Sequence, residues 1–382
     1  MKGKLLLGIF GSVLALGVAH IYINVGFDKF AADVKGMFAE KREELIVGFL
    51  PVTCHLTCPV VDWTTRHSES GSMYKSKRYS DFPTLCEDLT QGTLTAAFLN
   101  APLAISLAEK GVPVKFVTLG HRDGSAIVVP TASEVQDFPG LVGKKILIPS
   151  KFSNQQLWLA RLCKQNGVKL SDLNLVVAPP PDMPALLESG QCDAYVVGEP
   201  HCARAEMQGS GRILLQVKDS WPNFISCGLV VRQSLIDSNP DLIQELVDGI
   251  HGSGMWLEQN VENRFSAADV VGKYYYNQKP ELLKFVLSKP VDRVRYDALT
   301  PLKPDFDEIM DLALEVGMFK TRIEFEKYAD ARFAVGAPKV AIAMPPDDGL
   351  GLTVAVAPPK AADAPAQPAA TPPTPAAGTP TK

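Results

Sequence analysis

The sequence predicts an α/β fold with two domains or two lobes. Short apolar segments alternate with helical stretches along most of the chain, a pattern typical of parallel sheets covered by helices. With 382 residues, the chain is also longer than the roughly 250 to 300 residues at which one hydrophobic core stops growing. Its 38 basic and 42 acidic residues are interspersed, which argues against the basic surface that nucleic acid binding requires.

The N-terminal segment predicts export. Lys2 and Lys4 precede residues 5–27, which contain no Asp, Glu, Lys or Arg and are long enough to cross a bilayer. Two interpretations stay open: a retained membrane anchor, or a signal peptide cleaved after Ala19. Both place the rest of the chain in the periplasm or an equivalent extracytoplasmic space, and the anchor would tether it to the inner membrane. Residues 28–44 follow with an apolar spacing that predicts a linker helix.

Strands are predicted at apolar runs that turn residues bound. They cover residues 45–50, 93–99, 114–119, 125–129, 145–148, 173–177, 194–197, 212–216 and 225–231. Helices are predicted at residues 82–91, 101–110, 154–166 and 182–189, and in a series from 240 to about 331. The stretch 60–81 is charged and irregular, so it predicts no element. From Gly336 the composition turns to Ala, Pro and Thr, which predicts a disordered tail over residues 336–382.

Two neighbouring segments carry the clearest local patterns. In "ILIPSKFSNQQLWLARLCKQNG" a strand leads into a helix that Ser153 can cap, with Gln156 three residues on. Such a helix N-terminus can hold an anionic group, although ordinary capping also explains Ser153. In "APPPDMPALLESGQCDAYVVGEPHCARA" a proline run and a short helix precede a buried strand that ends at Glu199 and Pro200.

These segments resemble a known family. Residues 144–200, "KKILIPSK" to "VVGEP", are similar to the second lobe of the solute-binding proteins of nitrate, bicarbonate, taurine and alkanesulfonate ABC transporters. Residues 85–129 and 296–319 extend the resemblance over about 44–335. It implies a type II periplasmic binding protein fold, with a ligand cleft between two lobes joined by two crossover strands. The first lobe would take residues 45–127 and 222–335, and the second 128–221.

The resemblance also places the ligand at loops that follow strands. Ligand-binding candidates there are Thr53, Cys54, His55, Asn100, His121, Ser125, Ser153, Gln155, Glu199 and Cys227. Glu199, from the family's Glu-Pro turn, would bind a cationic group or a metal, or would hold the turn. No catalytic residue is predicted, because the sequence has no G-x-S-x-G, P-loop or H-E-x-x-H motif.

Cys54, His55 and Cys58 stand close together in "VTCHLTCP". Three interpretations of the two cysteines stay open: a disulfide or structural thiols, direct contacts to a ligand, or a site for a soft metal. Their spacing is neither a zinc motif nor a haem attachment motif. We therefore predict no cofactor, with a metal held by Cys54, His55 and Cys58 as the alternative.

The resulting prediction for function is an exported solute-binding component of an ABC transporter, and not an enzyme. It would capture a small ligand of the nitrate, sulfonate or taurine class by closing its lobes and deliver it to a membrane permease. Two alternatives remain. One is a metal-dependent biosynthetic enzyme of the type that makes the thiamine pyrimidine precursor, although the consecutive cysteines of those enzymes are absent here. The other is a ligand-sensing ectodomain.

Overall fold

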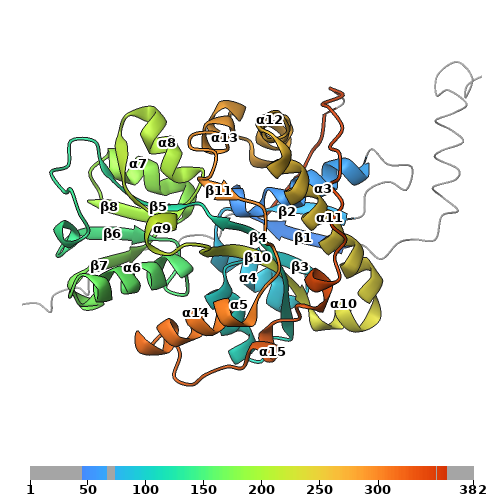
Figure 1. Ribbon diagram of the computed structural model, residues 1–382, viewed down its shortest axis with the longest axis horizontal. Helices are drawn as coiled ribbons and strands as arrows, with labels where there is room; N and C mark the ends of the chain where they lie inside the picture. The colour runs from blue at the N-terminus through green and yellow to red at the C-terminus, as the bar shows by residue number, and fades with distance from the viewer. Residues whose placement is uncertain (1–44, 67–73, 350, 359–382) are drawn as a thin grey trace, which may run out of the picture. The chain divides into compact units, whose positions relative to one another are not determined.

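A computed structural model describes residues 45–66, 74–349 and 351–358, all within one compact unit, Leu45–Lys382. Its strands form a seven-stranded and a five-stranded sheet (Figure 1). The predicted two-lobed α/β fold is confirmed. The predicted anchor or signal segment and the linker helix lie outside the described residues. Within the part of the chain that the structure describes, no helix is long and apolar enough to span a membrane.

The first sheet belongs to the first lobe and has the order β11-β4-β10-β3-β1-β2-β12. Strand β1 pairs in parallel with β2 and β3, whereas β10 runs antiparallel to β3 and β4. The strands are β1 (Leu45–Phe49), β2 (Tyr74–Arg78), β3 (Ala96–Leu99), β4 (Val114–Asp123), β10 (Ile225–Arg232), β11 (Val294–Arg295) and β12 (Ala355–Val356).

The second sheet has the order β7-β6-β8-β5-β9. Its parallel strands β6 and β8 are followed by helices, and β5 runs antiparallel to β8 and β9. The strands are β5 (Ser125–Pro130), β6 (Lys145–Ile148), β7 (Asn174–Val177), β8 (Ala194–Gly198) and β9 (Gly211–Gln216). The helices are α6 (Asn154–Gln165), α7 (Met183–Glu188), α8 (His201–Gln208) and α9 (Val217–Ser220).

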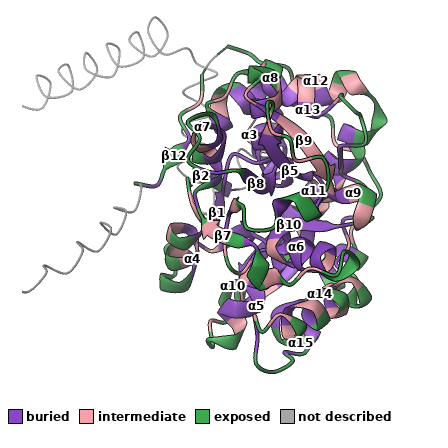
Figure 2. Cartoon of the chain, turned by 90° about the vertical axis from the view of Figure 1, so that its left-hand side faces the viewer, coloured by how far each residue is buried: buried purple, intermediate pink, exposed green. Residues whose placement is uncertain are grey.

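The remaining helices belong to the first lobe. Figure 2 shows buried strands in the interior, with the exposed residues concentrated on helices and loops. These helices are α3 (Thr57–Arg66), α4 (Phe82–Gln91), α5 (Ala101–Glu109), α10 (Gln233–Ser238), α11 (Pro240–Gln259), α12 (Val261–Val270), α13 (Pro280–Val286), α14 (Lys303–Glu315), α15 (Phe325–Tyr328) and α16 (Arg332–Val335). A π-helical turn, Val271–Tyr276, continues α12.

Residues 57–78 contain helix α3 and strand β2, where the sequence predicts no element. Asp62 is fully buried, and its carboxylate accepts hydrogen bonds from Arg66, one turn on in the helix, and from Ser76 of β2. Buried Tyr74 and Ser76 alternate with more exposed lysines along β2. The acidic residue that interrupts the apolar pattern of α3 is therefore paired inside the fold.

The described part of the predicted tail is ordered and packs on the first lobe (Figure 1, red). The indole nitrogen of Trp63 donates to the carbonyl of Pro345 at 2.9 Å, and β12 pairs with β2. Ile342 N donates to the carbonyl of Gly252 on α11 at 3.1 Å, where a Cβ on Gly252 would lie 2.8 Å from the tail. The predicted disorder is therefore wrong for residues 336–349 and 351–358.

Two crossings connect the sheets. The chain leaves β4 and enters β5 at Gly124, three residues before the predicted end of the first lobe at residue 127, and it returns between β9 and β10. Asp123, Gly124 and Asn223 at these crossings have φ of 64°, 71° and 61°. This left-handed region suits glycine and asparagine.

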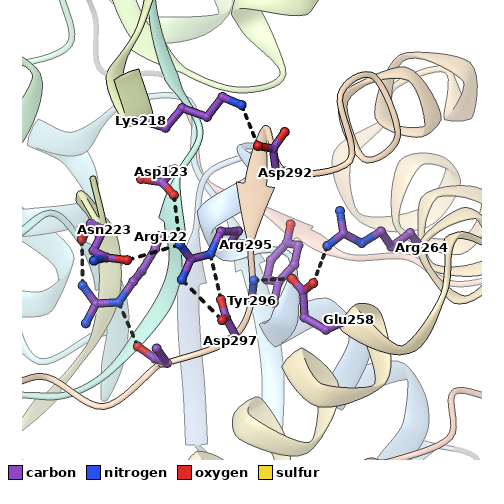
Figure 3. A network of polar contacts seen from close by, with 11 residues as sticks. Arg122, Asp123, Lys218, Asn223, Glu258, Arg264, Asp292, Arg295, Tyr296 and Asp297 are labelled. Atoms are coloured by element: carbon purple, nitrogen blue, oxygen red, sulfur yellow. Dashed lines mark hydrogen bonds and ion pairs between the residues drawn. The ribbon is translucent and has the colours of Figure 1, made fainter. Parts of the chain in front are cut away.

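A polar network surrounds both crossings (Figure 3). Arg122 donates to the carbonyl of Asn223 at 2.7 Å, and Arg295 of β11 donates to the Asn223 side chain at 3.2 Å. Lys218, which follows the second sheet, pairs with Asp292 at 2.7 Å. The two crossing segments are therefore bonded to each other and to the chain that leads into β11.

Candidate functional site

A cavity of about 20 Å³ lies between the two lobes. Such a space holds roughly one water molecule or a ligand group of similar size. The first lobe contributes residues that follow β1 and β3 or lie at the start of β10 or α4: Val52, Cys54, Phe82, Asn100, Ser226 and Cys227. The second lobe contributes residues near the ends of β6 and β8: Pro149, Gln155, Pro180, Val197 and Gly198. The cavity therefore lies where the cleft is predicted, at the carboxyl ends of parallel strands.

Two helices begin at the walls of this cavity, one in each lobe. Asn100 caps α5, since its side-chain oxygen accepts from Leu103 N at 3.1 Å. Gln155 lies in the first turn of α6 and donates to the Ser125 hydroxyl at 3.1 Å. Helix N-termini carry partial positive charge and unpaired N–H groups. The site therefore offers neutral donors and two favourable dipoles to an anion.

Hydrogen bonds across the cleft hold the lobes together. The Asn154 side chain on α6 donates to the carbonyls of Ile225 and Ser226 at 2.6 and 3.2 Å. Thr53 N donates to the carbonyl of Glu199 at 2.8 Å. These bonds link the second lobe to the first on both sides of the cavity, so the structure represents a closed arrangement.

Glu199 also links the lobes through its side chain. One carboxylate oxygen accepts from Ala203 N at 2.9 Å, and the other pairs with Arg293 of the first lobe at 3.0 Å. Both side chains are buried. Burial raises the pKa of Glu199, an effect that the charge of Arg293 opposes. Of the roles predicted for Glu199, the structure shows the turn-holding one and adds an ion pair.

Cys54, His55 and Cys227 form a compact buried group beside the cavity. Their ligand-type atoms all lie within 4.8 Å of one another. Burial opposes ionisation of Cys54, but a hydrogen bond from Cys227 and the charge of His55 hold the pKa of Cys54 well below its usual value. Burial and this hydrogen bond raise the pKa of Cys227. The two thiols therefore ionise in sequence, with Cys54 first.

His121 lies behind this group on β4. Its Nε2 is 2.9 Å from the Thr53 hydroxyl, and its ring meets that of Tyr296 edge-on at 5.6 Å. Burial lowers the pKa of His121 to about 4, although the charge of Cys54 raises it. The ring is therefore neutral at pH 7 and supports the Thr53 turn.

The structure divides the sequence-predicted residues into two groups. Cys54, Asn100, Gln155 and Cys227 line the cavity. The other predicted residues have supporting positions: Thr53, His55 and His121 behind Cys54, Ser125 beside Gln155, Ser153 as the cap of α6, and Glu199 in the ion pair.

Cys58 lies apart from the sulfur and imidazole group. It is a fully buried core residue, and its carbonyl accepts a hydrogen bond from the Tyr74 hydroxyl. All seven cysteines are free thiols. Cys58 is therefore packed as a core residue, and the group of possible ligand atoms that the structure brings together contains Cys227 in place of Cys58.

Sequence reasoning did not find Phe82 or Arg293. Phe82 follows β2. Because the sequence did not predict this strand, the loop after it is not among the predicted cleft loops. Arg293 is 94 residues from Glu199, and no local pattern connects them.

Comparison with known proteins agrees with this geometry. The fold is that of the two-lobed periplasmic binding proteins, with a candidate ligand cavity between the lobes. The model of the NMT1-like family matches residues 38–272, more than half of the chain, and the chain belongs to this family.

Individual relatives are more distant. The nitrate/nitrite binding protein NrtA of Synechococcus elongatus is 26% identical over 197 residues, which are 50% of this chain and 44% of NrtA. The chain thus matches less than half the length of that relative. The ligand-binding component of an ABC-type import system from Staphylococcus aureus, in a structure with zinc bound, shares the fold with a TM-score of 0.70 and 22% identity, over 78% of this chain and 100% of that one.

The periplasmic nitrate-binding protein NrtA of Synechocystis PCC 6803 also shares the fold. Its TM-score is 0.68 at 15% identity, over 76% of this chain and 87% of that one. At this identity the likeness concerns the fold alone. These three relatives are described as binding proteins or a ligand-binding component, whereas the desulfurization enzyme DSZB shares the fold with a TM-score of 0.55 at 14% identity, over 76% of this chain and 97% of that one.

Proposed function

We propose that the protein is the extracytoplasmic solute-binding component of an ABC transporter. It captures a small ligand of the nitrate, sulfonate or taurine class between its lobes and delivers it to a membrane permease. The single observation that carries the proposal is the closed cavity, to which both lobes contribute a polar side chain at a helix start. Binding requires only closure of the lobes around the ligand, with no covalent step.

The cavity favours the smallest members of this ligand class. Its volume of about 20 Å³ holds roughly one water molecule, so the lobes must open less to admit a planar anion such as nitrate than to admit an alkanesulfonate. Asn100 and Gln155 are its polar amides, one on each lobe. The names of the NrtA relatives agree with nitrate or nitrite as the ligand. The localisation follows from residues 5–27, interpreted as an anchor or signal segment.

Ligand binding can be tested by thermal unfolding in the presence of nitrate, nitrite, bicarbonate, taurine and ethanesulfonate. A ligand present at 100 times its Kd stabilises the folded state by about 2.7 kcal/mol, which raises the Tm by several degrees. We expect nitrate or nitrite to give this shift. If no anion of the panel changes the Tm, the proposed function is wrong.

A variant that adds a negative charge locates the binding site. Asn100→Asp keeps an oxygen that can cap α5 but replaces the amide donor with a carboxylate, which repels an anion in the cavity. We expect it to abolish the nitrate shift. Asn239→Asp is the matched control, because Asn239 caps α11 through the same kind of bond, to Leu242 N at 3.2 Å, and does not line the cavity. Equal shifts in both variants would place the anion elsewhere.

A further inference from the structure

We propose that Cys54, His55 and Cys227 bind a soft divalent metal ion of the zinc class at the wall of the cavity. This inference goes beyond the proposed function and does not rest on it. Thiolate and imidazole groups are the ligands that zinc prefers in proteins. Among the described residues, these three form the group with suitable donors close together.

The distances suit one ion. Zn–S bonds are about 2.3 Å and Zn–N bonds about 2.0 to 2.1 Å, so the ligands of one tetrahedral ion lie roughly 3.5 to 4 Å apart. The three donor atoms already lie within 4.8 Å of one another. Shifts of less than about 1 Å, within reach of side-chain rotation, complete the site. No backbone rearrangement is needed.

An unpartnered nitrogen points to a missing ligand. His55 is fully buried, and its Nε2 has no hydrogen-bond partner among the described residues. Buried polar atoms are otherwise almost always paired. The other ring nitrogen, Nδ1, lies 2.8 Å from Leu50 N and 3.1 Å from Leu50 O. Because Leu50 N donates to Nδ1, the neutral ring carries its proton on Nε2. A metal ion at Nε2 requires the other tautomer, in which the proton is on Nδ1 and can donate to Leu50 O, the usual arrangement of a metal-binding histidine.

The backbone around the ligands is held firmly. A Cβ on Gly120 of β4 would lie 1.9 Å from the carbonyl oxygen of Cys54, so glycine allows β4 to pack directly against the Cys54 turn. Cys227 lies on β10, which pairs with β4, and its register partner is His121. The ligands therefore stand on one sheet and one adjoining turn, which preorganises them.

Charge balance favours a divalent ion. Two thiolates carry two negative charges, and a divalent cation neutralises them in a site where an unpaired buried charge is costly. A monovalent ion would leave one negative charge buried. Three protein ligands leave the fourth position of zinc open. Because Cys54 and Cys227 line the cavity, a water or an anionic ligand group can take this position, and the ion removes the repulsion between an anion and the Cys54 thiolate.

The test is a zinc titration of the purified protein, kept reduced and first stripped of metal with a chelator. Zinc retained after dialysis is measured by elemental analysis. We expect one equivalent in the wild type and a small fraction of an equivalent in Cys54→Ser, Cys227→Ser and His55→Gln. Cys58→Ser is the matched control, because Cys58 is a buried thiol near Cys54 in the chain and outside the group, and it should retain one equivalent.

Cadmium provides an independent readout. The ultraviolet charge-transfer band of cadmium thiolates should appear with one equivalent in the wild type and in Cys58→Ser, and should lose most of its intensity in either single ligand-cysteine variant. Circular dichroism identifies which variants are folded, and a folded His55→Gln protein tests the site if a cysteine variant unfolds.

Two outcomes overturn the proposal: a wild type that retains no stoichiometric zinc, or one equivalent retained in the folded Cys54→Ser/Cys227→Ser double variant. A nitrate shift measured both in metal-free protein and with one equivalent of zinc tests the proposed function separately, because a shift in either form supports anion binding and its absence in both forms contradicts it.

Discussion

The ion pair between Glu199 and Arg293 joins the two lobes and offers a sharp test of the closed arrangement. Its atoms are 3.0 Å apart, and the side chains are 1% and 5% exposed. Replacing Arg293 with methionine removes the charge and keeps most of the side-chain length. Removal of one partner from a buried pair costs about 3 to 5 kcal/mol, because the other charge stays buried without compensation.

We therefore expect Arg293→Met to lower the free energy of unfolding by about 3 to 5 kcal/mol, measured by urea denaturation followed through tryptophan fluorescence. Adding Glu199→Gln should recover at least about 1 kcal/mol, since the buried unpaired charge is then gone; Glu206, which also pairs with Arg293 at 3.1 Å, is 36% exposed and stays hydrated. Lys164→Met is the matched control. Its pair with Glu315 also measures 3.0 Å, but the side chains are 67% and 51% exposed, so the loss should stay below about 1 kcal/mol.

The pH dependence of this variant has a definite sign. Burial raises the pKa of Glu199 in the folded state, and without Arg293 the rise is larger. A carboxyl with a raised folded pKa stays protonated at low pH and destabilises the fold as pH rises through that pKa. The deficit of Arg293→Met should therefore be smaller near pH 4.5 than near about pH 7.5. A loss under about 1 kcal/mol at both pH values, or no recovery in the double variant, would refute the reasoning.

Three further predictions follow from single sites. Gly124→Ala should destabilise the protein by at least about 1 kcal/mol more than Gly111→Ala. Both residues have positive φ, but only at Gly124 would the new Cβ lie 2.6 Å from a Val294 side-chain atom. Equal midpoints in urea denaturation would contradict this. Burial lowers the pKa of His201 to about 3. Between about pH 6.5 and 3 the unfolded chain therefore binds more protons than the folded one, so the free energy of unfolding of the wild type should fall by a few kcal/mol as the pH drops through this range. His201→Leu should flatten that profile, and an unchanged slope in urea titrations across this range would count against it. Met344→Asp should release the ordered tail and expose it to limited proteolysis, because Met344 is 9% exposed, whereas Val340→Asp, at a residue 66% exposed, should leave the cleavage pattern as in the wild type.

Local patterns predicted most of the regular elements. Strand β6 and helix α4 match their predicted bounds, since apolar runs, caps and glycines mark their ends. The sequence also predicted that Cys54, Asn100, Gln155 and Cys227 face a cleft, because they follow or begin elements at the ligand-binding edge of a sheet. Strand β2 was missed, since its exposed lysines conceal the alternation of Tyr74 and Ser76.

The sequence by itself determined the α/β class, the boundaries of most elements and the helix caps, because these depend on neighbours within a few residues. Only the tertiary structure decided which distant groups meet. It paired Glu199 with Arg293, brought Cys227 instead of Cys58 to Cys54 and His55, and docked the Pro345 segment on Trp63. Such pairings depend on sheet order and on the crossings between lobes, and segments far apart in the chain carry no local signal of their contact.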